Sequence, residues 1–415
     1  MTFTSPLAEA LAPDVLDRFE RYVRVDTQSA RRVGRTPSTP GQWDLARMLV
    51  EELRASGLAD AEVDEHCYVY ATLPGPEGAP VVGLLAHMDT SPDAPGAGVE
   101  PLVHRGYDGG VLALPRAGTV LDPADMPVLG TKAGHDIVTS SGDTLLGADD
   151  KAGVAEIMAA VAHLAAHPDL PRPTLRVGFT PDEEIGEGPL KFDLERFRVS
   201  CAYTLDASQP GELQDETFDA VEATITIDGV DVHPGWATGK MVNAARLAGR
   251  ILAALPPGLS PEATGGRDGF VHPYEVEATP ARAVVRAIVR DFDENLLQRH
   301  VELLRSTAEQ VVAAEPRAAL TFDVKRQYSN MRRQLEAFPD VVERAARAIR
   351  AEGLEVVREP IRGGTDGAIL SARGLPTPNL FTGGHEYHSV REWASVQDMA
   401  SAAAVIVRLA AQWAW

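Results

Sequence analysis

The pattern of predicted helices and strands changes twice along the chain, and these changes constrain the fold most. Up to about residue 213, helix-like segments such as 14–23 and 43–53 alternate with strand-like segments such as 67–73 and 81–87. Residues 81–86 are continuously apolar, which is typical of a strand buried on both faces. This alternation predicts an α/β architecture, with a mixed, mostly parallel sheet covered by helices.

Residues 214–326 have a different pattern of predicted secondary structure. Strand-like segments dominate there, and the pattern predicts three strands and two helices: 220–228, 274–278, 282–290, 241–255 and 294–314. After residue 326 the alternation of helices and strands returns. The pattern predicts a helix over 335–352, a strand over 354–358, an apolar run over 377–381 and a C-terminal helix through 409. At 415 residues the chain is long enough for two domains. We therefore predict a catalytic α/β domain in two pieces, 1–213 and 327–415, interrupted by an inserted α+β lid domain, 214–326.

Charge and cysteine content exclude several classes of protein. Sixty acidic residues against thirty-nine Lys and Arg give a net charge of −21, which repels nucleic acid and anionic membranes and favours cationic ligands or metal ions. The two cysteines, Cys67 and Cys201, cannot form a disulfide framework. No apolar stretch approaches the roughly 18 residues that span a bilayer, and the first residues do not resemble a signal peptide. We therefore expect a cytoplasmic protein without nucleic-acid or membrane partners.

Histidines and acidic residues cluster just past the predicted strands. The positions are His87 and Asp89, Asp149 and Asp150, Asp182 to Glu184, Asp206, and His385 and Glu386. In open α/β sheets the carboxyl ends of the strands form the edge where ligands bind, so these side chains are expected to converge. Taken singly, each has an ordinary explanation as a helix cap or a solvated side chain.

Convergence of so many carboxylates and imidazoles indicates a metal site. Without cations the carboxylates would repel one another and their pKa values would shift strongly. Nitrogen and oxygen ligands without cysteine suit zinc, cobalt or manganese. Two ions fit the number of ligands better than one, with a carboxylate bridging them. Of the adjacent pair Glu183 and Glu184, one can bind metal while the other takes a proton from water.

Seven segments, in order and spacing, resemble the di-zinc exopeptidase family that includes aminoacylases and succinyl-diaminopimelate desuccinylase, and most closely its tripeptide aminopeptidases. The segments are LLAHMDTS, LLGADDKAG, TPDEEIGEG, YTLDA, VHPGWATGKMVNA, RGGTDGAIL and TGGHEYHS. The resemblance covers nearly the whole chain. It implies a zinc-exopeptidase catalytic domain and hydrolysis of the N-terminal peptide bond of tripeptides.

The resemblance also assigns roles to individual residues. It implies two zinc ions, with cobalt or manganese as substitutes, held by His87 and Asp206 on one side, by Glu184 and His385 on the other, and bridged by Asp149. Glu183 is implied as the general base, and Asp89 as the residue that orients His87 through its second ring nitrogen. A cis peptide bond between Asp149 and Asp150 is implied as well.

Two further residues are implied to contact the substrate. His233, in the inserted domain, matches a histidine that stabilises the tetrahedral oxyanion. Arg362 resembles the residue that receives a substrate carboxylate or backbone carbonyl, for which a guanidinium group is well shaped. Homodimers formed through the lid domain are common in this family.

Rival functions remain at this stage. A related dipeptidase, carboxypeptidase or N-acyl amino acid deacylase would use the same metal chemistry on a different short substrate. A catalytically silent peptide-binding protein would have lost the base or a ligand, yet Glu183 and all five ligand positions are filled. We therefore predict a metallo-aminopeptidase whose partners are short peptides.

Overall fold

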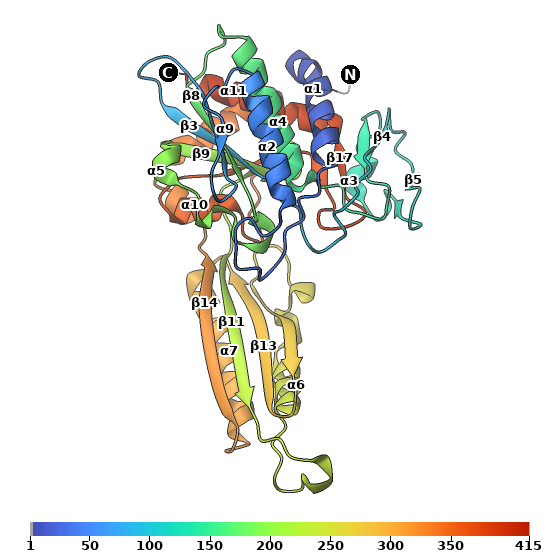
Figure 1. The fold of residues 1–415 in the computed structure, drawn as a ribbon, viewed down its shortest axis with the longest axis vertical. Coiled ribbons are helices and arrows are strands. Elements are labelled where there is room, and N and C mark those ends of the chain that lie inside the picture. Colours follow the sequence, from blue (N-terminus) through green and yellow to red (C-terminus); the bar gives the residue numbers. More distant parts are fainter. Residues whose placement is uncertain (1–2, 415) are drawn as a thin grey trace. The chain divides into compact units, whose positions relative to one another are not determined.

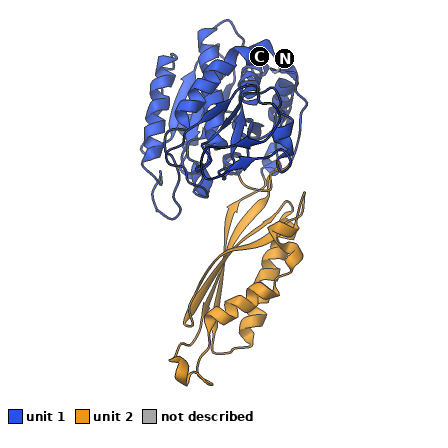
Figure 2. Ribbon diagram, turned by 90° about the vertical axis from the view of Figure 1, so that its right-hand side faces the viewer, with its two compact units in different colours: residues 1–215, 331–359, 365–415 blue, residues 216–330, 360–364 orange. Residues whose placement is uncertain are grey.

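The computed structural model describes residues 3–414, which form two compact units. Unit 1 contains the residues up to 215, 331–359 and those from 365 onward, and unit 2 contains 216–330 and 360–364 (Figure 2). The domain boundaries expected from the sequence, 1–213, 214–326 and 327–415, stay a prediction. Residues 360–364 differ, because they were expected in the catalytic domain and belong to unit 2.

The main sheet of unit 1 has seven strands in the order β1-β2-β8-β3-β9-β15-β10. Figure 1 labels three of its central strands, β8, β3 and β9. Its four central strands, β8, β3, β9 and β15, run parallel, whereas β1, β2 and β10 are antiparallel to their neighbours. The mixed sheet with a parallel centre agrees with the predicted α/β class. As a result, the carboxyl ends of four central strands lie along one edge.

The elements of unit 1 have the following bounds. The strands are β1 Glu62–Val63, β2 Val69–Leu73, β3 Val81–His87, β4 Leu102–His104, β5 Leu112–Ala113, β6 Val120–Leu121, β7 Ile137–Thr139, β8 Thr174–Thr180, β9 Cys201–Ala207, β10 Leu213–Gln214, β15 Asn379–Phe381, β16 Gly384–His385 and β17 Trp393–Ser395. The helices are α1 Pro6–Tyr22, α2 Gly41–Ala55, α3 Pro127–Gly130, α4 Ala148–Ala166, α5 Leu194–Phe197, α8 Arg332–Leu335, α9 Pro339–Ala351, α10 Asp366–Ala372 and α11 Val396–Gln412.

Helices bury the sheet. Helix α4 contacts β3 and packs against α1 and α11, which also contact each other (Figure 1). Fourteen of the nineteen residues of α4 are buried, as expected for a mostly apolar helix that is covered on several sides. A separate aromatic cluster around Phe192 and Phe197 packs against β2 and β3 residues such as Tyr70 and Leu85. The central strands are therefore fixed between packed layers, so the side chains at their ends have rigid supports.

A second, four-stranded sheet in unit 1 has the order β16-β17-β7-β4. Strand β16 pairs antiparallel with β17, and the residues between them form a loop. Helix α11 begins directly after β17, where the Ser395 side chain caps it by accepting a hydrogen bond from the Asp398 amide. This arrangement anchors both ends of the 386–392 loop.

Unit 2 is an antiparallel sheet with two helices on it. Its elements are β11 Asp219–Asp228, β12 Phe270–Ala278, β13 Arg282–Asp291, β14 Ala319–Tyr328, α6 Ala244–Ala254 and α7 Glu294–Ala313, with the strand order β12-β13-β11-β14. Strand β11 alternates buried residues such as Ala223 and Ile225 with less buried ones, and the buried set packs with α6 and α7 residues. The ribbon in Figure 2 shows the helices of unit 2 on one face of its sheet. The α+β character predicted for this region is present.

Two details of the predicted strands are wrong. The segment 354–358 was expected to be a strand, but only Val357 forms an isolated bridge, with Glu212. Strand β14 was not predicted at all. Among residues 3–414 no helix combines the length and the apolar character that crossing a bilayer requires.

Candidate metal centre

Side chains from two central strands, a short 3-10 helix, the start of α4 and the loop between β16 and β17 converge at the carboxyl edge of the main sheet. His87 is the last residue of β3, Asp206 lies near the end of β9, and Glu184 lies in a short 3-10 helix, Glu183–Ile185, that follows β8. Asp149 lies at the start of α4, and the loop after β15 and β16 carries His388. The parallel order of the strands explains why residues so distant in sequence meet here.

The first cluster consists of His87, Asp149 and Asp206, whose ligand atoms lie within 4.8 Å of one another. The His87 Nε2 atom is 2.9 Å from Asp149 Oδ1 and 3.7 Å from Asp206 Oδ1. Burial by itself lowers the pKa of His87, but the carboxylates of Asp149, Asp206 and Asp89 outweigh burial and raise that pKa well above its usual value. The imidazole therefore lies in a strongly negative environment.

The second cluster consists of Asp149, Glu184 and His388. The His388 Nε2 atom is 2.8 Å from Glu184 Oε2 and 3.4 Å from Asp149 Oδ2. The other oxygen of Glu184, Oε1, is buried and has no hydrogen-bond partner among the described residues. On the solvent side, Asp93 Oδ2 lies 3.5 Å from His388 Nδ1. Burial and the neighbouring Asp149 raise the pKa of Glu184 to about 8.

Asp149 belongs to both clusters, and its two carboxylate oxygens face different histidines. Its Oδ1 atom faces His87, and its Oδ2 atom faces His388. Although burial works in the opposite direction, these two histidines lower the pKa of Asp149. The peptide bond between Asp149 and Asp150 is cis, as the sequence resemblance implied.

The donor set fits divalent cations. At about 4 Å, two like charges repel by roughly 4 kcal/mol in the effective dielectric of a protein surface, so clustered carboxylates need compensation. The atoms that converge are imidazole nitrogens and carboxylate oxygens, which zinc, cobalt and manganese accept. The buried Glu184 Oε1 atom, which has no hydrogen-bond partner among the described residues, is likewise suited to bind a cation.

His385, the histidine expected in the second cluster, lies elsewhere. Its ring stacks on Trp393 at 4.2 Å, and its Nδ1 atom is 3.0 Å from Ser208 Oγ. The pairing of β16 with β17 explains this, because it places His385 opposite Trp393. Glu386 and His388 both have positive φ angles, and the backbone then turns so that His388 faces Glu184 and Asp149. The structure therefore brings His388, rather than His385, together with Asp149 and Glu184.

Asp89 contacts His87, although not mainly through its carboxylate as expected. The His87 Nδ1 atom is 3.0 Å from the Asp89 backbone oxygen and 3.5 Å from Asp89 Oδ1. The carboxylate accepts the amide hydrogens of Glu183, at 2.9 Å, and of Glu184, at 3.2 Å. Asp89 thus fixes the tautomer of His87 with its backbone and holds the Glu183–Glu184 turn with its side chain.

Glu183 is held from a second side as well. Asp182 adopts a left-handed conformation, with φ 59°, directly before it. The Asp182 carboxylate accepts hydrogen bonds from Ser38 and from Gln42 Nε2, the latter at 2.7 Å. Burial raises the pKa of Glu183 well above its usual value, and the nearby Asp206 contributes in the same direction although His87 opposes it. A raised pKa makes a carboxylate a better proton acceptor, which suits the expected role of Glu183 as general base.

Sequence reasoning also missed Glu392. This glutamate is 1% exposed, and its carboxylate accepts three backbone N–H groups of the loop that presents Asp149. It lies four residues after His388, in a segment without periodicity. Its spacing therefore offered no signal.

The two predicted substrate contacts, His233 and Arg362, belong to unit 2. His233 lies in an exposed loop, where its ring packs on Trp236 at 4.6 Å and accepts a hydrogen bond from the Gly235 amide. The Arg362 guanidinium donates to the backbone oxygens of residues 266 and 268 and to Thr264 Oγ1, at 2.8 to 3.0 Å. Arg362 therefore holds the 264–268 loop. Substrate contact by either residue stays a prediction.

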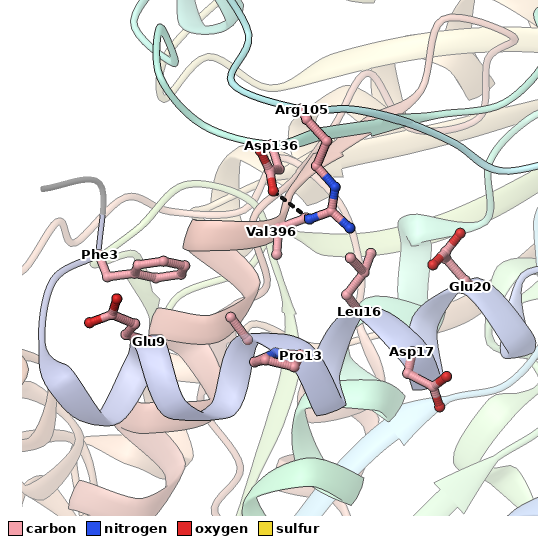
Figure 3. Close-up of a pocket in the computed structure, with 10 residues that line it drawn as sticks. Phe3, Glu9, Pro13, Leu16, Asp17, Glu20, Arg105, Asp136 and Val396 are labelled. Carbon is pink, nitrogen blue, oxygen red and sulfur yellow. Dashed lines mark hydrogen bonds and ion pairs between the residues drawn. The ribbon is translucent and has the colours of Figure 1, made fainter.

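A cavity of about 490 Å³ lies against α1, away from the residues described above (Figure 3). Its walls include Glu9, Asp17 and Glu20 of α1, and Arg105, which is paired with Asp136 at 2.6 Å. None of its lining residues belongs to the two clusters. The cavity plays no part in the chemistry derived below.

Comparison with known proteins places this geometry in context. The sequence profile of peptidase family M20/M25/M40 matches residues 144–412. Peptidase T of Geobacillus sp. strain WCH70 is 44% identical over 399 residues, which cover 95% of this chain and 97% of that protein. Peptidase T of Bacillus subtilis strain 168 is 44% identical over 402 residues, which cover 96% and 98%.

Solved structures share the fold. Aminopeptidase PepT from Bacillus cereus ATCC 10987 superposes with a TM-score of 0.73 at 22% identity, covering 97% of this chain and 99% of that one. YXEP of Bacillus subtilis, described as a dinuclear metal-binding peptidase of the M20 family, superposes with a TM-score of 0.63 at 17% identity, covering 97% and 98%.

Proposed function

Because the chain belongs to peptidase family M20/M25/M40, we propose that it releases the N-terminal residue of tripeptides by metal-dependent hydrolysis. The observation that carries the proposal is the position of Asp149, whose two oxygens face two separate clusters, each with its own histidine and a second acid. This is the arrangement expected of a carboxylate that bridges two ions. The relatives named peptidase T support the substrate class.

We assign two zinc ions to the clusters, with cobalt or manganese as substitutes. His87 and Asp206 would hold one ion, Glu184 and His388 the other, and Asp149 both. His388 takes the place expected for His385. When bound, the ions supply a Lewis acid for the scissile carbonyl and a water that deprotonates readily near neutral pH.

The chain's own residues perform the proton transfers. Glu183 takes a proton from the attacking water and delivers it to the leaving amine. The Asp89 carboxylate accepts the Glu183 amide, and Ser38 and Gln42 donate to the Asp182 carboxylate, so the backbone that carries Glu183 is held in place. We also keep His233 as the proposed donor to the developing oxyanion.

Metal analysis tests the two-ion site. Protein incubated with excess zinc and then dialysed should retain about two ions per chain, and a chelator should abolish hydrolysis until zinc, cobalt or manganese is returned. Anomalous scattering at the zinc edge would locate both ions. Retention of a single ion by fully active protein would refute the bridging role of Asp149.

Substrate length and a free amino terminus form a second prediction. A tripeptide should have a higher kcat/KM than the matching dipeptide and tetrapeptide, because each added residue moves the far terminus by about 3.3–3.6 Å, more than a fixed contact absorbs. N-acetylation should nearly abolish cleavage, since the amino group is lost as a cation. Product analysis by mass spectrometry measures both effects.

The same panel separates the rival functions. A dipeptidase would prefer the dipeptide, a carboxypeptidase would release the C-terminal residue, and a deacylase would release acetate from the blocked substrate. A silent peptide-binding protein would cleave none of them even when loaded with metal. We also infer a cytoplasmic location, which the two free, buried cysteines support, and a homodimer through unit 2 stays a prediction.

A further inference from the structure

Helix α4, which presents Asp149, is capped by a side chain of its own only from Asp150 onward, where Asp150 Oδ1 accepts the Gly153 amide at 3.2 Å. Its N-cap residue is Gly147, with φ +84°, and glycine has no side chain to accept the unpaired amides at the helix start. Asp149 and Asp150 then depart from helical φ and ψ values. The backbone on which the shared carboxylate is mounted is therefore not fixed by ordinary helix geometry.

Glu392 supplies the missing acceptor from a distant part of the chain. Its Oε2 atom accepts the amides of Leu146, at 2.7 Å, and Gly147, at 2.8 Å, while its Oε1 atom accepts the amide of Asp149, at 3.0 Å. Both oxygens are used, and each faces only N–H donors. A carboxylate suits such a site because it accepts with both oxygens and donates with neither.

We propose that Glu392 is a positioning residue for Asp149, whose amide it holds so that one carboxylate oxygen faces each histidine. Glu392 also ties this turn to the loop that carries His388, four residues earlier. The segment that carries Asp149 is thereby joined, through one buried acceptor, to the segment that carries His388. The inference rests on the proposed function, because it concerns how the chain holds the bridging ligand.

The test compares Glu392→Gln with a matched control, Glu352→Gln. Glutamine keeps the shape but turns one acceptor into an NH₂ group, which must face an N–H donor. Glu352 is equally buried at 1% exposure, binds Ser5, Thr4 and Arg408, and is not part of the site. Zinc affinity, measured by competition with a chromogenic chelator, should fall about 10–100-fold in Glu392→Gln and stay unchanged in Glu352→Gln.

A second variant covers the case in which Glu392→Gln does not fold. Glu392→Asp keeps the charge and both oxygens but is one methylene shorter, so it cannot reach the Leu146–Gly147 pair and the Asp149 amide together. It too should bind zinc more weakly than the parent protein, and at saturating zinc the loss of activity should appear in kcat rather than KM. Wild-type zinc affinity in either folded Glu392 variant would overturn the proposal. If the parent protein itself bound no zinc, the proposed function would fail instead.

Discussion

Glu183→Gln protein should retain both metal ions and lose nearly all turnover. The amide has the size of the carboxylate and leaves the amides of the turn bound to Asp89, but it cannot accept a proton from water. Loss of a general base costs about 10²–10⁴ in rate. Steady-state kinetics on a tripeptide, together with metal analysis of the same sample, would measure both quantities.

The matched control is Glu187→Gln, which changes a glutamate four residues further along the same turn and outside both clusters. That variant should keep the parent kcat. Near-normal turnover by metal-loaded Glu183→Gln would show that Glu183 is not the general base. If Glu183→Gln lost its metal ions, Glu183 would instead be a residue that the metal site needs for its structure.

The second large effect separates the two histidines of the 385–388 loop. His388→Ala should hold about one ion per chain and lose more than about 100-fold in activity. Mutation of a residue that only hydrogen-bonds to a metal ligand already costs about 10–100-fold in metal affinity or activity. His385→Ala should keep both ions, because its ring stacks on Trp393 and faces neither cluster. It should instead unfold at a lower temperature, since it leaves a cavity beside Trp393.

Metal content and thermal unfolding of the two alanine variants decide between these assignments. If His385→Ala lost an ion while His388→Ala kept two, the original assignment of His385 would stand and the assignment of His388 would be wrong.

The fold could be predicted where hydrophobic periodicity is strong. Strands β3 and β8 and helix α4 are buried, and their apolar patterns are clear. Strand β14 was missed because it lies at the edge of its sheet, where residues 323–327 are all exposed and the apolar alternation is lost. The 354–358 segment looks like a strand in composition, but only Val357 finds a partner.

The part of the site that lies at the ends of predicted strands could be predicted from the sequence. His87 ends a strand and Asp206 lies near the end of another, so the topology alone brings them together. The choice between His385 and His388 depends on two positive φ angles in a short loop, and no periodicity encodes those. Glu392 acts through backbone amides of a segment far away in sequence, so neither residue type nor spacing marks it.

The chain passes between the two units at four points, 215/216, 330/331, 359/360 and 364/365. Unit 2 is therefore built from two separate segments of the chain, 216–330 and 360–364. A chimaera that exchanges only residues 216–330 with a relative would leave the native 360–364 segment behind, and Arg362 would then meet a foreign 264–268 loop. A chimaera should therefore exchange segments 216–330 and 360–364 together. Among chimaeras that fold and are active, we expect both segments to come from the same parent protein.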